Sequence, residues 1–141
     1  MNIVCYGNPM DKTFHDLWSL MRQTHPELGL ELHSSLLSFS ARLREPRRNI
    51  AVVMLYINDR ETMTELLSVR SLLKDLPIVI LLKDQEPGIL EFAHQLMPRV
   101  IVYTWWRIGD ICGVLQRCIG RSRDLEVILR EGTDTEAGIR E

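Results

Sequence analysis

The stretch AVVMLYINDRE, residues 51–61, has five apolar residues, a tyrosine and one more apolar residue before it turns polar. An apolar run of this length without alternation is typical of a β-strand that is covered on both faces. The polar residues Asn58 and Asp59 follow at once, and apolar residues at helical spacing resume at Met63. The stretch therefore predicts a buried strand over Ile50–Ile57 that leads through a short turn into a helix.

The same kind of run recurs along the chain. Asn2–Tyr6, Ile78–Leu82 and Val100–Tyr103 are nearly continuous apolar runs, whereas Leu28–Leu32 alternates as an edge strand does. Apolar residues at helical spacing separate and follow these runs. The expected helices are Phe14–Met21 with Asp11 as its cap, Leu36–Leu43, Met63–Leu73, a helix opened by Pro87, and one from Ile108 to Ile119.

Five alternating strand and helix units predict one parallel sheet with helices on both of its faces. The 141 residues, 45% of them hydrophobic, are enough for one globular domain over residues 1–122, with a helical extension and flexible tail over 123–141. Because crossovers in such a sheet bring all strand ends to one edge, any ligand or switch site is expected at the carboxyl ends of the strands.

The composition limits the kinds of partner that the protein is expected to bind. A net charge of −2 gives no broad basic field for nucleic acid or an anionic membrane. The run Arg42, Arg44, Arg47 and Arg48 is expected to be a solvated helix end, and DNA binding through it is a disfavoured alternative. An odd count of three cysteines and no leader or long apolar segment favour a cytoplasmic protein.

The layout, with PIVILLKD (77–84) as the fourth strand and VYTWWRIGDICGVL (102–115) as the fifth strand and its helix, resembles the receiver domain of bacterial response regulators. The resemblance implies a flavodoxin-like sheet of order 2-1-3-4-5. It also places the family's phosphorylation machinery on residues of the wrong chemistry. The acidic pair falls on Tyr6, Gly7 and Asn8, the phosphoacceptor aspartate on Tyr56, the threonine on Leu82 and the lysine on Thr104.

Phosphorylation of a receiver needs a carboxylate nucleophile, further carboxylates for Mg²⁺, and a cation with a hydroxyl that respond to the phosphoryl group. A phenol, whose ordinary pKa is about 10, cannot take the nucleophile's place. The resemblance thus implies a pseudo-receiver in a bacterial signalling pathway, without catalysis, metal or cofactor. Tyr56 is expected to be a partly buried ring whose hydroxyl reaches Asn8 or Thr104, and Asp11, Asp59 and Asp84 are expected to be helix caps and turn formers rather than a displaced metal site.

Two features indicate a protein partner, with a homodimer as the expectation. The consecutive Trp105 and Trp106, followed by Arg107, fall at the edge of the face that receivers use for dimers, formed by their fourth helix, fifth strand and fifth helix. Apolar spacing also continues to Leu125, Ile128 and Leu129, although Gly120 could break that helix.

A rival interpretation belongs to another class of protein. The strand ends could form a neutral polar pocket in a small α/β enzyme or ligand-binding protein, with Tyr6, Asn8, Tyr56, Asn58 and Thr104 as its lining.

Overall fold

The computed structural model describes residues 2–8, 10–45, 49–83 and 86–131, with side chains up to residue 119. Its five strands form one parallel sheet in the order β2-β1-β3-β4-β5. This confirms the predicted sheet and its order. The strands are β1 (Asn2–Tyr6), β2 (Gly29–His33), β3 (Ile50–Ile57), β4 (Ile78–Leu82) and β5 (Val100–Tyr103).

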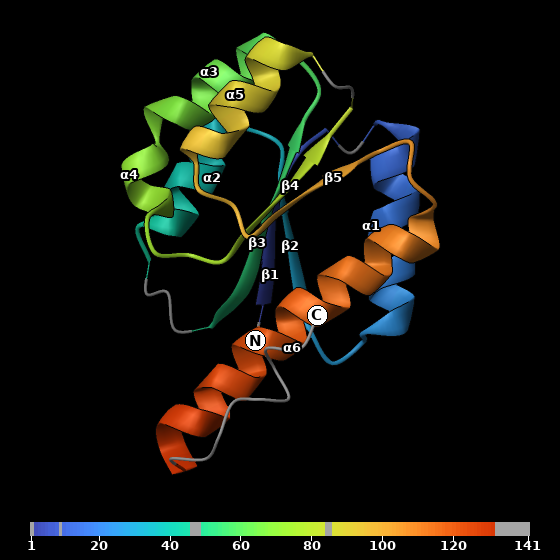
Figure 1. The fold of residues 1–141 in the computed structure, drawn as a ribbon, viewed down its shortest axis with the longest axis vertical. Coiled ribbons are helices and arrows are strands. Elements are labelled where there is room, and N and C mark those ends of the chain that lie inside the picture. The colour runs from blue at the N-terminus through green and yellow to red at the C-terminus, as the bar shows by residue number, and fades with distance from the viewer. Residues whose placement is uncertain (1, 9, 46–48, 84–85, 132–141) are drawn as a thin grey trace.

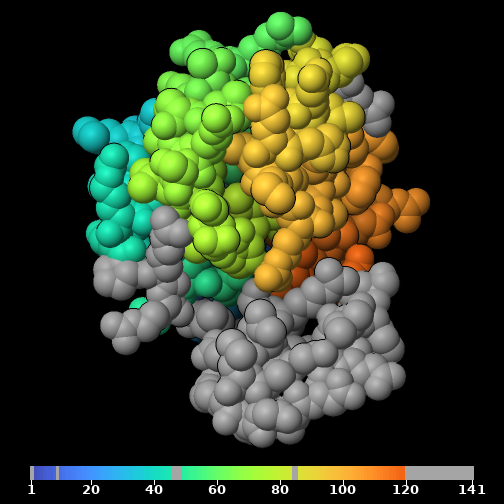
Figure 2. Space-filling view, turned by 60° about the vertical axis from the view of Figure 1, so that its left-hand side comes forward, coloured from blue at the N-terminus to red at the C-terminus, as the bar shows by residue number. Residues whose placement is uncertain are grey.

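Six helices connect and follow the strands in the described residues, and they cover both faces of the sheet (Figure 1). On one face, α1 and α6 pack in a single apolar cluster with alternate strand residues. On the other face, α2, α3 and α5 do the same, and Figure 2 shows α3, α4 and α5 side by side on this face. The helices are α1 (Lys12–Thr24), α2 (Leu36–Leu43), α3 (Arg60–Ser68), α4 (Arg70–Leu73), α5 (Pro87–Gln95) and α6 (Ile108–Glu131).

Successive residues of a strand point to opposite faces, and this alternation decides which helix each strand end meets. Tyr56 joins the cluster of α1 and α6, whereas Tyr6, Ile57 and Leu82 join the cluster of α2, α3 and α5. The two tyrosines therefore end on opposite faces of the sheet, although they lie on neighbouring strands.

The prediction of a single helix from Met63 to Leu73 is wrong. It is divided at Val69, whose φ of −114° and ψ of 17° lie outside the helical region. Valine is a weak helix former because its branched side chain loses rotational freedom in a helix. The division lets Leu66, Val69 and Leu73 all remain buried while α4 turns to contact α2.

Helix α6 continues through Gly120 to Glu131, so the alternative of a break at Gly120 is not what the structure has. Figure 1 shows its last turns extending beyond the sheet. The tail expected to be flexible from residue 132 onward lies outside the described residues. Within the described part of the chain, no helix has the length and apolar character needed to cross a membrane.

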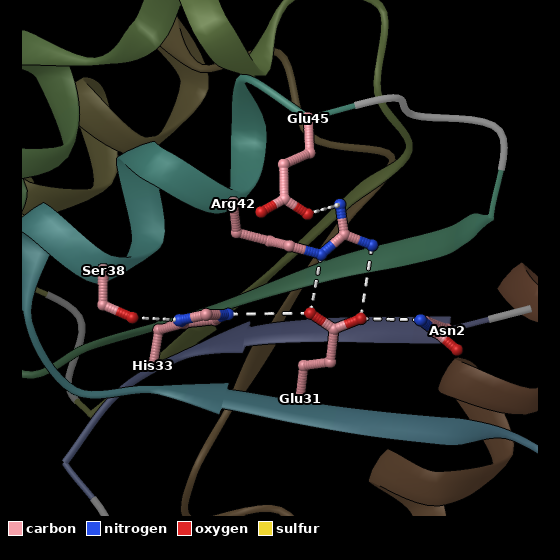
Figure 3. A network of polar contacts seen from close by, with 6 residues as sticks. All are labelled: Asn2, Glu31, His33, Ser38, Arg42 and Glu45. Atoms are coloured by element: carbon pink, nitrogen blue, oxygen red, sulfur yellow. Dashed lines mark hydrogen bonds and ion pairs between the residues drawn. The ribbon is translucent and has the colours of Figure 1, made fainter.

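A polar network fixes the β2 edge of the sheet (Figure 3). Arg42 Nε and Nη2 donate to the two carboxylate oxygens of Glu31 over 2.7 and 3.2 Å, and Asn2 Nδ2 donates to the same carboxylate over 2.6 Å. The Arg42 side chain is only 12% exposed, so the expectation of a solvated helix end is wrong for this residue. Its apolar neighbours Phe39 and Leu43 turn that side of α2 toward the sheet. Arg47 and Arg48 lie outside the described residues.

Burial acts against ionisation of Glu31, but the hydrogen bonds and charge of Arg42, assisted by Asn2 and His33, outweigh it and lower the pKa of this carboxyl. His33 lies beside the pair, with Nδ1 2.5 Å from Ser38 Oγ and Nε2 3.7 Å from Glu31 Oε1. The network joins β1, β2 and α2 through side chains, at a strand that has a neighbour on one side only.

Candidate functional site

The carboxyl ends of the strands are aligned by backbone hydrogen bonds between neighbouring loops. Gly7 N donates to His33 O over 3.1 Å, Lys83 N to Ile57 O over 3.3 Å, and Thr104 N to Leu82 O over 2.8 Å. The parallel strands thus end together at one edge, where receivers carry their phosphorylation machinery. This edge contains all the residues predicted to be degenerate positions of that machinery.

Tyr56 is buried at the end of β3, with 2% of its surface exposed. Its ring stacks on Phe14 of α1 with 5.4 Å between centroids and 3° between planes. Its hydroxyl donates to Asp11 Oδ2 over 2.8 Å, so the predicted partners Asn8 and Thr104 are wrong. Asp11 lies within reach of the Tyr56 hydroxyl because of its place at the start of α1, where it caps the helix by accepting from Phe14 N over 3.1 Å. Helix α1 packs on the face of the sheet to which Tyr56 points.

The phenol of Tyr56 has no tendency to become a nucleophile at neutral pH. Burial first, and then the hydrogen bond and charge of Asp11, raise its pKa well above the ordinary value. The side chain therefore stays neutral and donates its proton to Asp11. A neutral phenol under an aromatic ring cannot supply the carboxylate oxygen on which a receiver's acyl phosphate forms.

Gly7 is one of the three residues on which the resemblance places the receiver's acidic pair, and the space above it is already filled. A Cβ added to Gly7 would lie 3.0 Å from Tyr56 Cβ and 3.2 and 3.3 Å from two atoms of the Phe14 ring. An acidic side chain there would have to displace the stacked rings. The neighbouring Asn8 is exposed, and its Oδ1 accepts from Met10 N over 2.9 Å in the turn before α1.

Leu82 and Thr104 are the two remaining residues that the resemblance assigns to the phosphorylation machinery. Both make other contacts in the structure. Leu82 is 1% exposed and belongs to the apolar cluster under α3 and α5. Thr104 Oγ1 donates to Lys83 O over 3.4 Å, which ties β5 to the loop after β4. Neither side chain contributes a charge or a hydroxyl proton to the space around Tyr56.

The carboxylates at this edge serve as helix caps where they are described. Asp11 caps α1, and Asp59 caps α3 by accepting from Thr62 N over 2.8 Å. Hydrogen bonds from the backbone and side chain of Thr62 lower the pKa of Asp59. The predicted third member, Asp84, lies outside the described residues. Among the described residues, no three His, Cys, Asp or Glu side chains are grouped as a metal site would need.

On the other side of β1 and β3, a cleft of about 240 Å³ opens between the strand ends and α3. It contains Tyr6, Asn8, Tyr56 and Asn58, four of the five residues predicted for a polar pocket, but not Thr104. The prediction of a neutral pocket is wrong, because the cleft also contains the carboxylate of Glu65. Its full lining is Tyr6, Gly7, Asn8, Ser34, Tyr56, Asn58, Thr62 and Glu65.

Tyr6 and Glu65 form a polar contact inside this cleft. Tyr6 Oη donates to Glu65 Oε1 over 3.1 Å, and its ring packs on Phe39 with 5.0 Å between centroids. Burial, followed by the hydrogen bond and charge of Glu65, raises the pKa of Tyr6 to about 12. The sequence could have indicated Glu65 as a cleft residue because it lies three residues after Thr62. This spacing puts both side chains on one side of α3.

The two consecutive tryptophans lie in different surroundings. Trp105 is 62% exposed and stacks on Tyr103 with 5.4 Å between ring centroids. Trp106 packs against the core cluster of α1 and α6, with its ring 81° from that of Trp105. Arg107 is exposed just before α6 begins. Leu125, Ile128 and Leu129 lie in α6, beyond the described side chains.

Comparison with solved structures identifies the class of fold. A response regulator receiver protein from Burkholderia phymatum superposes with a TM-score of 0.64 at 13% identity, covering 85% of this chain and 96% of that one. The N-terminal signal receiver domain of a Bacteroides fragilis response regulator gives 0.60 at 20% identity, covering 84% and 95%. A putative CpaE2 pilus assembly protein from Sinorhizobium meliloti gives 0.59 at 9% identity, covering 84% and 99%.

The chain therefore has the fold of response regulator receiver domains, as its layout predicted. At these identities the likeness concerns the fold alone. No protein-family model matches the sequence, and no curated protein matches it.

Proposed function

We propose that this chain is a pseudo-receiver, a module of bacterial signal transduction that works without phosphorylation and without catalysis or a cofactor. The observation that carries the proposal is the Tyr56 and Phe14 stack, which fills the place of the phosphoacceptor and closes over Gly7. The fold is that of receiver domains, but the side chains to which the resemblance assigns the phosphorylation site are neutral, and Asp11 and Asp59 are committed to helix caps. Three buried cysteines, which form no disulfide among the described residues, favour the cytoplasm as its compartment.

A module without a phosphorylation switch acts through a surface that is always present. We place that surface at the edge strand β5 and the two helices beside it, α5 and α6, which correspond to the receiver's fourth and fifth helices because α3 is divided here. Trp105 is the largest exposed aromatic side chain there, and Phe92 of α5 is 40% exposed. Aromatic residues and arginine are enriched at the centres of interfaces, so Trp105, Trp106 and Arg107 are the proposed contact residues.

A homodimer through this face, or through Leu125, Ile128 and Leu129 of α6, is the form that we propose first. Sedimentation velocity over micromolar to millimolar concentrations should show the mass rising from 16.4 kDa toward twice that value. Trp105→Ala should keep the protein monomeric, whereas Leu37→Ala, which removes an 80% exposed apolar side chain from α2, should leave dimerisation unchanged. A monomer at every concentration would contradict the homodimer, and a dimer that survives Trp105→Ala would move the interface to α6.

Independence from phosphorylation has its own test. Incubation with acetyl phosphate and Mg²⁺ should leave the intact mass unchanged, whatever the oligomeric state. A gain of one phosphoryl group at an aspartate would contradict the proposal. The second candidate function, ligand binding at the strand ends, is supported by the cleft beside Glu65 and is independent of both tests.

A further inference from the structure

The cleft beside Glu65 lies where the order of the sheet changes direction. From β1 the chain continues outward to β2, and from β3 it continues the opposite way to β4 and β5. The loops after β1 and β3 separate at such a point and leave a crevice, in which α/β proteins of this topology bind ligands. Here the crevice is formed by Tyr6, Gly7 and Asn8 after β1, by Asn58 after β3, and by the first turns of α3.

Two hydroxyl groups that line the cleft, those of Tyr6 and Thr62, have their protons committed to carboxylates. Tyr6 donates to Glu65, and the side chain of Thr62 hydrogen bonds to Asp59. A hydroxyl that donates its proton keeps its oxygen lone pairs available as acceptors. These two oxygens therefore remain available as acceptors for a ligand that brings N–H or O–H groups of its own.

The charge of the cleft points in the same direction. Glu65 is half-buried and has no ion pair with any described residue, and its described side-chain partner is the neutral Tyr6. Asp59 adds a second negative charge close to Tyr6. The described lining contains no lysine or arginine. An unpaired carboxylate in a recess, where the solvent screens it less, is a site for a cation.

Two further observations narrow the chemical class of the cation. The described residues do not group three metal-binding side chains anywhere, so a multivalent metal lacks its ligands. A volume of about 240 Å³ holds roughly eight water molecules at about 30 Å³ each, which is enough for an ammonium group on a short alkyl chain. An ammonium group has three donors and no acceptor.

We propose that this cleft binds the ammonium group of a primary amine, with Glu65 as its counter-ion and the oxygens of Tyr6 and Asn58 as further acceptors. The amine is either a small free molecule or a lysine side chain that a partner protein inserts. In both cases the head group enters between the loop after β1 and the first turns of α3.

The test is an amide NMR titration of the full chain with n-butylammonium chloride, with n-butanol and sodium butyrate as neutral and anionic controls. Saturable shifts of the Gly7 backbone amide and the Asn58 side-chain amide are expected with butylammonium alone, at a Kd of about millimolar. A capped glycyl-lysyl-glycine peptide, run in parallel, assigns the source. Tighter binding of the peptide indicates a partner's lysine, and tighter binding of butylammonium indicates a free amine.

Two variants of α3 make the test specific. Glu65→Gln keeps an acceptor for Tyr6 but removes the charge, and it should weaken butylammonium binding about tenfold. Glu61→Gln removes an exposed charge from the same helix and should leave the Kd unchanged. Absence of saturable shifts, equal binding of n-butanol, or an equal loss of affinity in both variants would overturn the proposal.

Discussion

Replacing Tyr56 with aspartate, the residue that the resemblance to receivers places at this position, is expected to destabilise the protein severely and to leave it without a phosphorylation site. The ring is 2% exposed and stacked on Phe14, so its removal leaves a cavity that costs about 3–5 kcal/mol. The new carboxylate would be buried below Phe14 beside Asp11, without a cation among the described neighbours, at a further cost of about 1–3 kcal/mol.

The sum, about 4–8 kcal/mol, is comparable with the whole free energy of unfolding of a typical domain, about 5–15 kcal/mol. Urea denaturation followed by far-UV circular dichroism should therefore show Tyr56→Asp largely unfolded or with a strongly lowered midpoint. The matched control, Tyr56→Phe, keeps the stack and loses only the hydrogen bond to Asp11, so it should cost about 1–2 kcal/mol.

A Tyr56→Asp variant that unfolds within about 2 kcal/mol of the wild type would refute this reasoning, because it would mean that the stack does not support the fold. A folded variant that takes up a phosphoryl group from acetyl phosphate would refute it as well. That result would show that the residues around position 56 can still support phosphorylation once an aspartate replaces Tyr56.

Four further results are expected. Gly7→Ala should cost about 1–3 kcal/mol in urea denaturation because its Cβ meets Tyr56 Cβ and the Phe14 ring, whereas Gly109→Ala, with open space around it in α6, should be neutral or stabilising. Arg42→Leu should cost about 1–3 kcal/mol by leaving the half-buried Glu31 without its cation, and a double-mutant cycle with Glu31→Gln should show coupling between the two. Because the pKa of Glu31 is lowered in the folded protein, its contribution is present above about pH 4.5 and lost as the pH falls, so Glu31→Gln should flatten the acid limb of thermal unfolding. Tyr6 has a raised pKa of about 12, so its contribution is complete below about pH 10 and is lost as the pH rises toward 12; Tyr6→Phe should remove this part of the alkaline destabilisation.

The sequence by itself determined the layout of this protein. Four strands begin and end where their apolar runs do, because a strand covered on both faces needs apolar residues at successive positions, and β2 differs from its expected span by one residue at each end. The sequence also showed that Gly7, Tyr56 and Thr104 carry neither a carboxylate nor an amine, since side-chain chemistry is a local property. The net charge and the helix caps Asp11 and Asp59 could be predicted from the sequence for the same reason.

Only the tertiary structure decided which side chains meet. Tyr56 and Asp11 are 45 positions apart, Tyr6 and Glu65 are 59 apart, and Glu31 and Arg42 come from a strand and the following helix. Each contact depends on the face to which a strand end points and on the helix that packs on that face. Periodicity identifies a buried face but does not name the helix that covers it, so the partner of Tyr56 and the negative charge of the cleft appear only when the sheet is assembled.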